Sequence, residues 1–109
     1  MKLQNLEVIV TAPPATGWGG RYWILVKLTT DTGLVGWGEC YATSVGPKAM
    51  THVIADVFAR HMQNEHPENI EKMFRRVYSS GFTQRPDLTV MGAFSGLEIA
   101  CWDILGKHR

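Results

Sequence analysis

This sequence lacks an excess of either acidic or basic residues, and this charge balance limits what the protein can bind. The 109 residues contain 11 Lys and Arg against 10 Asp and Glu, a formal net charge of +1 at pH 7. Proteins that bind nucleic acid or anionic membrane surfaces do so with an excess of basic side chains. The charge balance provides no electrostatic basis for either partner, so we expect neither nucleic acid nor a membrane among them.

Cysteines and long apolar runs are scarce as well. The only two cysteines, Cys40 and Cys101, lie in apolar segments. This predicts free, buried thiols in a reducing compartment and no disulfide. The first residues, MKLQNLEV, lack the apolar region of a signal peptide, and the longest apolar run is shorter than the roughly 20 residues that span a bilayer. Together these features predict a cytoplasmic protein.

Motifs for catalysis and metal binding are also missing. The glycines of residues 17–20 do not form the G-x-G-x-x-G pattern of a nucleotide loop, because position 22 is Tyr. His52 and Asp56 are four residues apart, but a metal site needs three or four convergent ligands. We therefore expect solvated histidines. We likewise expect the basic side chains of the segment 67–79 to form a solvated face. These are Lys72, Arg75 and Arg76.

Hydrophobic periodicity predicts three strands followed by three helices. Alternating patterns with many β-branched residues indicate strands, and apolar residues at helical spacing indicate helices. The expected strands are 2–11, 22–30 and 34–41, and the expected helices are 47–62, 67–79 and 90–107. Gly33 ends the short turn between the second and third strands and should adopt a left-handed conformation. The predicted fold class is α+β, a three-stranded antiparallel meander followed by a three-helix bundle, with residues 1–109 as one domain.

The third strand and the last helix have unusual surfaces. Gly36 and Gly38 share one face of the strand, where a missing side chain lets another backbone or a ring approach. Glu39, on the other face, is either an acid–base group or a carboxylate that accepts hydrogen bonds from loop amides, and we favour the second. The helix 90–107 is apolar on most of its circumference. Such a helix is buried between two partners, and the rest of the chain provides one of them.

Three loops carry candidate ligand contacts. In the loop 12–21, Trp18 stands between glycines. It either folds back onto the sheet, or forms a lid with Arg21 that faces a ligand. A second loop covers residues 42–46. In the polar loop 81–89, Arg85 either binds a carboxylate bidentately or pairs with Asp87.

Four segments together resemble the N-terminal capping domain of the enolase superfamily. They are WILVKLTTDTGLVGWGE at 23–39, H-P-x-x-I-E at 66–71, Y-x-x-G-F at 78–82 and ACWDILGK at 100–107. The closest resemblance is to the mandelate racemase / muconate lactonizing enzyme group, particularly its acid-sugar dehydratases. It covers essentially the whole chain, with the segments in the family's order.

The resemblance implies an enzyme larger than this chain. In that family the capping domain closes over a C-terminal (β/α)7β barrel, which carries the catalytic bases and three acidic ligands for one Mg²⁺. None of those groups can be placed on this sequence, so residues 1–109 alone are expected to be inactive. The parent enzyme is expected to be a homo-oligomer that removes the proton α to the carboxylate of a small sugar acid. We expect a dehydratase, with a racemase or cycloisomerase as the alternative. A freestanding binding module is the alternative of another class.

The resemblance also implies which residues contact substrate. Residues 14–21 correspond to the family's mobile substrate-sensing loop, and the loop near 42–46 corresponds to its second flap. No catalytic or metal-binding residue is expected in this chain. The implied substrate contacts are Thr16, Trp18 and Arg21 from the first loop, Thr43 and Ser44 from the second, and Arg85 as a weaker candidate.

Overall fold

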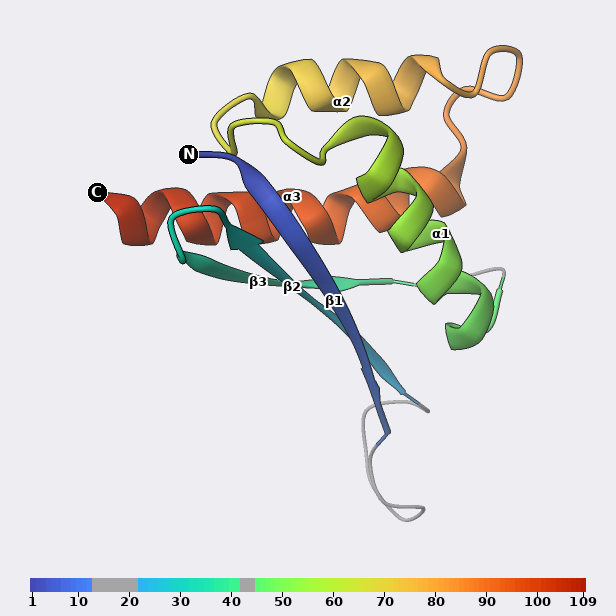
Figure 1. Cartoon of the computed structure of the whole chain (residues 1–109). Coiled ribbons are helices and arrows are strands. Elements are labelled where there is room, and N and C mark those ends of the chain that lie inside the picture. Colours follow the sequence, from blue (N-terminus) through green and yellow to red (C-terminus); the bar gives the residue numbers. More distant parts are fainter. Residues whose placement is uncertain (13–21, 42–44) are drawn as a thin grey trace.

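A computed structural model describes residues 1–12, 22–41 and 45–109, and it confirms the predicted order of three strands followed by three helices (Figure 1). The strands are β1 (Leu3–Thr11), β2 (Trp23–Thr30) and β3 (Val35–Cys40). The helices are α1 (Pro47–His61), α2 (Ile70–Ser79) and α3 (Leu88–His108). The fold is α+β, as the hydrophobic periodicity predicts.

The sheet is antiparallel, with strand order β1-β2-β3. Val26 of β2 pairs with Val8 of β1 on one side and with Gly38 of β3 on the other. Gly33 has φ +89° and donates its backbone N–H to the carbonyl of Thr30 at 3.0 Å, so the predicted left-handed glycine turn is confirmed. Side chains alternate along β2 because successive residues point to opposite faces of a sheet.

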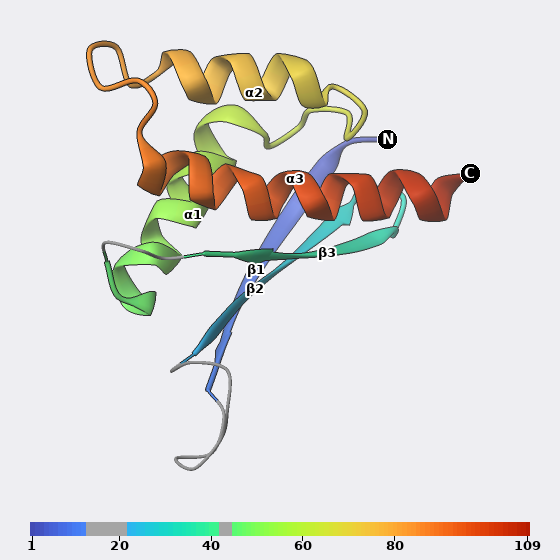
Figure 2. The same cartoon turned by 180° about the vertical axis from the view of Figure 1, so that it is seen from behind.

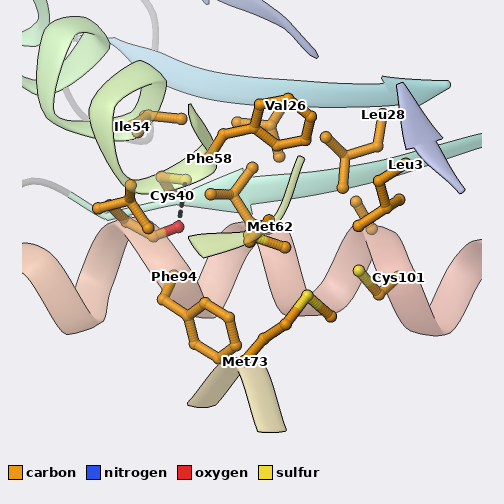
Figure 3. Packing of buried hydrophobic residues seen from close by; sticks show 14 of the residues in the cluster. Leu3, Val26, Leu28, Cys40, Ile54, Phe58, Met62, Met73, Phe94 and Cys101 are labelled. Atoms are coloured by element: carbon orange, nitrogen blue, oxygen red, sulfur yellow. Dashed lines mark hydrogen bonds between the residues drawn. The ribbon is translucent and has the colours of Figure 1, made fainter. Parts of the chain in front are cut away.

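The three helices lie on one face of this sheet (Figures 1 and 2). α3 runs along β3, α1 crosses beside it, and α2 lies on the side of α3 away from the sheet. Between these layers lies an apolar core, and Thr30 is the one buried polar residue among those the structure describes. Phe94 points from α3 toward α2, while Val26 and Leu28 reach the core from the sheet (Figure 3). The opposite face of the sheet carries Trp23 and Trp37, which are 42% and 41% exposed.

β3 and α3 meet backbone to backbone, along what we call the glycine seam, formed by Gly36, Gly38 and Gly96. A Cβ on Gly38 would collide with the carbonyl oxygen of Gly96. A Cβ on Gly36 would collide with the carbonyl oxygen of Ala100, and one on Gly96 with the Cys40 side chain. The expectation that the bare face of this strand admits another backbone is therefore confirmed.

Two helices begin at other residues than predicted, α3 because of its N-cap and α2 because of the turn that precedes it. α3 begins two residues before position 90, because the Asp87 carboxylate accepts hydrogen bonds from the backbone N–H groups of Thr89 and Val90 at 3.0 and 3.2 Å. α2 begins at Ile70 instead of position 67, since residues 67 and 68 form a turn in which His66 Nδ1 accepts from the Glu68 N–H at 3.1 Å.

α3 obtains part of the burial that its composition requires. The sheet and the other helices bury its main apolar stripe, and Met91 packs partly buried against the same core. Ile99 and Trp102 remain 49% and 56% exposed on the opposite side. By length and composition alone α3 is apolar enough to cross a bilayer, but its contacts with β3 identify it as a core helix of this fold.

The loop between α1 and α2 is held by an ion-pair cluster around Glu65. Arg76 donates to the Glu65 carboxylate at 2.7 Å and to the His61 carbonyl at 3.0 Å. Lys72 Nζ and Asn69 Nδ2 also lie 3.3 Å from the Glu65 carboxylate. The prediction of a solvated basic face is therefore wrong for Arg76, whose half-buried side chain binds Glu65, but it is confirmed for Lys72, whose side chain is 60% exposed. Arg75 does lie on an exposed face, where it pairs with Glu71 at 2.6 Å.

The Glu65 cluster makes stability depend on pH. The hydrogen bond from Arg76, together with those from Asn69 and Lys72, lowers the pKa of Glu65 from 4.5 to about 2. This stabilisation is fully present above pH 4.5 and is lost as the pH falls toward 2. Glu65→Gln should therefore lower the free energy of unfolding by about 2 kcal/mol at pH 7, after allowance for the partly exposed Arg76, and by less at pH 3. Urea denaturation at the two pH values measures the difference.

The matched control is Glu71→Gln, which removes an exposed carboxylate from its arginine partner on the same helix. An exposed pair of this kind contributes about 0.5 kcal/mol or less. If the two variants lose equal stability at pH 7, or if the Glu65→Gln deficit is the same at pH 3, the cluster does not stabilise the loop as described.

Candidate functional site

The sheet brings the bases of two predicted substrate loops to one end. Thr11 at the end of β1 pairs with Trp23 at the start of β2, and the next residue, Ile24, pairs with Cys40 at the end of β3. The chain therefore leaves β1 and β3, and enters β2, at the same sheet end (Figure 1). The five candidate contacts from these loops lie outside the described residues, and they are Thr16, Trp18, Arg21, Thr43 and Ser44.

The described residues at this end of the sheet are mainly large and apolar. Val10 and Trp23 are 44% and 42% exposed, Tyr41 is 76% exposed, and Tyr22 is half-buried. Glu39 is exposed on the face of β3 away from the helices. Rings and aliphatic side chains of this kind can exclude water and line a binding surface.

The two cysteines do not add a nucleophile. Both thiols are free and buried, as predicted. Burial raises the pKa of Cys40 to about 12, although a backbone hydrogen bond with Gly96 opposes this, and burial likewise raises the pKa of Cys101 to about 12. Cys40 donates its S–H to the Ala93 carbonyl at 3.4 Å (Figure 3). Because the thiolate is the reactive form, both groups are chemically inert packing residues at neutral pH.

Arg85 belongs to a different part of the molecule. Its guanidinium donates to the Ser79 carbonyl at 3.0 Å, at the end of α2. Asp87, considered above as its ion-pair partner, instead caps α3. The segment between α2 and α3 lies at the opposite side of the molecule from the joined end of β1 and β2 (Figures 1 and 2). The fold therefore does not bring Arg85 together with the base of the first loop.

The described part of the chain contains no candidate metal site. Within residues 1–12, 22–41 and 45–109, no three His, Cys, Asp or Glu side chains come together in a way that could hold a metal ion. These residues do not fit a Mg²⁺ site, and no catalytic step is assigned to a metal on them.

Sequence reasoning missed one polar site, at the end of α3. Asp103 and Lys107 both bond to the backbone of β3. Their signal was present in the sequence, as an acid followed four residues later by a base near a helix C-terminus, but helical spacing alone suggests an ordinary surface pair.

A three-stranded meander packed backbone to backbone on a long helix, with the bases of both loops at one sheet end, defines an α+β domain. The family model for the mandelate racemase / muconate lactonizing enzyme N-terminal domain matches residues 8–109. The chain belongs to this family, within the enolase superfamily, as its motifs predict.

Known relatives agree with this assignment. A mandelate racemase/muconate lactonizing enzyme from Sulfitobacter sp. has a solved structure that superposes with a TM-score of 0.96 at 87% identity, over 100% of this chain and 28% of that one. D-galactarolactone cycloisomerase of Agrobacterium fabrum is 33% identical over 81% of this chain and 22% of its own length. A D-galactonate dehydratase family member of Streptomyces bingchenggensis is 33% identical over 94% of this chain and 23% of its own. The chain thus spans about a quarter of these relatives.

Proposed function

We propose that this chain is the capping domain of a larger enzyme that acts on a sugar acid, most directly as a dehydratase. The observation that carries the proposal is the family match over residues 8–109, together with relatives named for galactonate and galactarolactone. The shared sheet end supports it, because loops that start from one edge can converge on one ligand. The domain's part is to recognise substrate and exclude water, while the rest of the enzyme supplies the chemistry.

The exposed side of α3 supports a second part of the proposal, that the remaining domain docks on this helix. Ile99 and Trp102 are about half exposed, and Leu88 on the same side is 75% exposed. A large, partly unburied apolar stripe on a core helix is typical of an interface. In this proposal the partner is a C-terminal (β/α)7β barrel, which holds the Mg²⁺ and the bases that remove the proton α to the carboxylate. Assembly into a homo-oligomer belongs to the same proposal.

The proposed substrate contacts are the loop residues Thr16, Trp18, Arg21, Thr43 and Ser44. Arg21 supplies a guanidinium that matches a carboxylate bidentately, and Trp18 supplies a ring that covers the ligand. Arg85 is the weaker candidate, because its guanidinium already binds the Ser79 carbonyl.

The test is steady-state kinetics of the full-length enzyme with galactonate, galactarate and related acids, in the presence of Mg²⁺. Arg21→Met should reduce kcat/KM by about 10- to 100-fold, the effect of losing one charged hydrogen-bond partner. Arg75→Met is the matched control, because it removes an equally charged side chain from an exposed helix surface. Equal kcat/KM for wild type and Arg21→Met would remove this loop from the substrate site. Turnover by residues 1–109 alone would contradict the capping role.

A cycloisomerase is the second candidate, favoured by the name of the Agrobacterium fabrum relative. Product analysis separates the two: a dehydratase converts a hydroxy acid into a keto acid with loss of water, whereas a cycloisomerase rearranges a lactone without changing its mass. The freestanding binding module predicts instead an intact mass near 12.2 kDa and a complex that buries Met91, Ile99 and Trp102 between chains. The mass of the protein from its native source distinguishes it from both enzymes.

A further inference from the structure

The W-D-I-L-G-K segment at the end of α3 contains a polar contact that substrate recognition does not explain. Asp103 Oδ2 accepts a hydrogen bond from the backbone N–H of Trp37 at 2.9 Å. Lys107 Nζ donates to the backbone carbonyl of Val35 at 2.9 Å and to Asp103 Oδ2 at the same distance. Two side chains one helical turn apart therefore bind two backbone groups of one strand, and each also binds the other.

The strand that they bind is an edge of the sheet. Among the residues that the structure describes, β3 pairs with β2 alone, so its other side carries N–H and C=O groups that no described strand satisfies. Trp37 N–H and Val35 C=O are such groups, and in an extended sheet a fourth strand would bind them. The side chains of α3 occupy these positions instead.

The electrostatics favour the same arrangement. The hydrogen bond from Lys107, and next that from the Trp37 backbone, lower the pKa of Asp103 below its usual value, so the carboxylate is ionised at neutral pH. Hydrogen bonds to an ionised group are stronger than neutral ones. The glycine seam places the α3 backbone directly on the inner face of β3, which brings the end of the helix within reach of the strand edge.

We propose that Asp103 and Lys107 are positioning residues that stand in for a fourth strand, fastening the outer edge of β3 to the last turns of α3. The pair closes the Val35–Trp37 edge to other strands and sets the angle between helix and sheet. If the function proposed above holds, this angle relates the docking helix to the sheet end that carries both substrate loops. The fastening itself does not depend on that function.

Hydrogen–deuterium exchange on the full-length protein tests the proposal, with the Trp37 amide as the readout. Asp103→Ala should accelerate exchange at Trp37 by about 10- to 100-fold, the loss expected for one hydrogen bond to a charged acceptor. Amides of β1 should exchange as in wild type. Asp103→Asn keeps an oxygen acceptor and should retain most of the protection. Lys107→Met, which leaves the Asp103 carboxylate in place, should accelerate Trp37 exchange less than Asp103→Ala does.

The matched control is Arg75→Met, which breaks another acid–base pair spaced four residues apart, on α2 and without any strand contact. Its Trp37 exchange should equal that of wild type. The proposal is overturned if Asp103→Ala leaves Trp37 exchange unchanged, or if Asp103→Ala accelerates β1 as much as β3, since that pattern reports general destabilisation. If Asp103→Ala does not fold, Lys107→Met decides, because it should still accelerate Trp37 exchange relative to wild type; unchanged exchange in this variant would then overturn the proposal. Because exchange is measured without substrate, its outcome is independent of the enzyme assay.

Discussion

Replacing Gly38 by Ala is expected to lower the free energy of unfolding by about 3 kcal/mol, the upper end of the range for overpacked sites. The added Cβ would lie 3.0 Å from the Gly96 carbonyl carbon and 3.1 Å from the Ala100 backbone nitrogen, besides its collision with the Gly96 oxygen. These neighbours are backbone atoms, which cannot rotate away as a side chain can. Urea denaturation followed by circular dichroism measures the loss.

The matched control for Gly38→Ala is Gly106→Ala near the end of α3, the helix against which Gly38 packs. A Cβ at Gly106 meets nothing within 4 Å, and Ala is about 0.5–1 kcal/mol better than Gly within a helix. This variant should therefore be as stable as wild type or more stable. A similar loss in both variants would show that the seam is no closer than an ordinary helix contact.

Phe94→Ala is expected to cost about 3–5 kcal/mol, because it leaves a cavity between α3 and α2. The Phe94 side chain is 1% exposed, and its ring meets the Phe74 ring edge-on with centroids 6.1 Å apart. Met73 and Val77 of α2 are buried in the same core, so α2 cannot move to close the cavity without disturbing their packing. Thermal and urea denaturation should both detect the loss.

Phe82→Ala controls for the general effect of removing a phenyl ring. Phe82 is 78% exposed in the segment between α2 and α3, and surface substitutions of this kind usually change stability by about 0.5 kcal/mol or less. Comparable losses for Phe82 and Phe94 would contradict the placement of Phe94 in the core.

The fold could be predicted from the sequence because its strongest patterns are local. Alternation along residues 22–30, the Gly33 turn and the helical spacing of 47–62 each depend on neighbours in the chain. The start of α3 was predicted two residues late although Asp87 is a good N-cap residue, because the apolar pattern was weighted above the cap. The start of α2 was predicted three residues early because Pro67 suits the first turn of a helix, yet it lies in the preceding turn.

The polar contacts could not be predicted, because they join residues far apart in the chain. Arg76 reaches Glu65 across 11 positions, and Trp37 reaches Asp103 across 66. Nothing in the spacing of single residues indicates such partners.

The candidate site could be predicted only through the family resemblance, since its loop residues carry no periodicity. Arg85 shows the limit: its residue type suggested a ligand, and its guanidinium binds a backbone carbonyl.

The glycine seam bears on how a domain of this kind can diversify. Where two backbones touch, no residue larger than glycine fits. Point mutations of Gly36, Gly38 or Gly96 are therefore not tolerated and cannot give the domain a new binding preference. The seam places no such restriction on the two loops that follow β1 and β3, because these loops begin where the sheet ends. A lineage can therefore change these loops while the frame that carries them is inherited unchanged. Under the proposed function, substrate range and structural integrity become separable traits within one small domain.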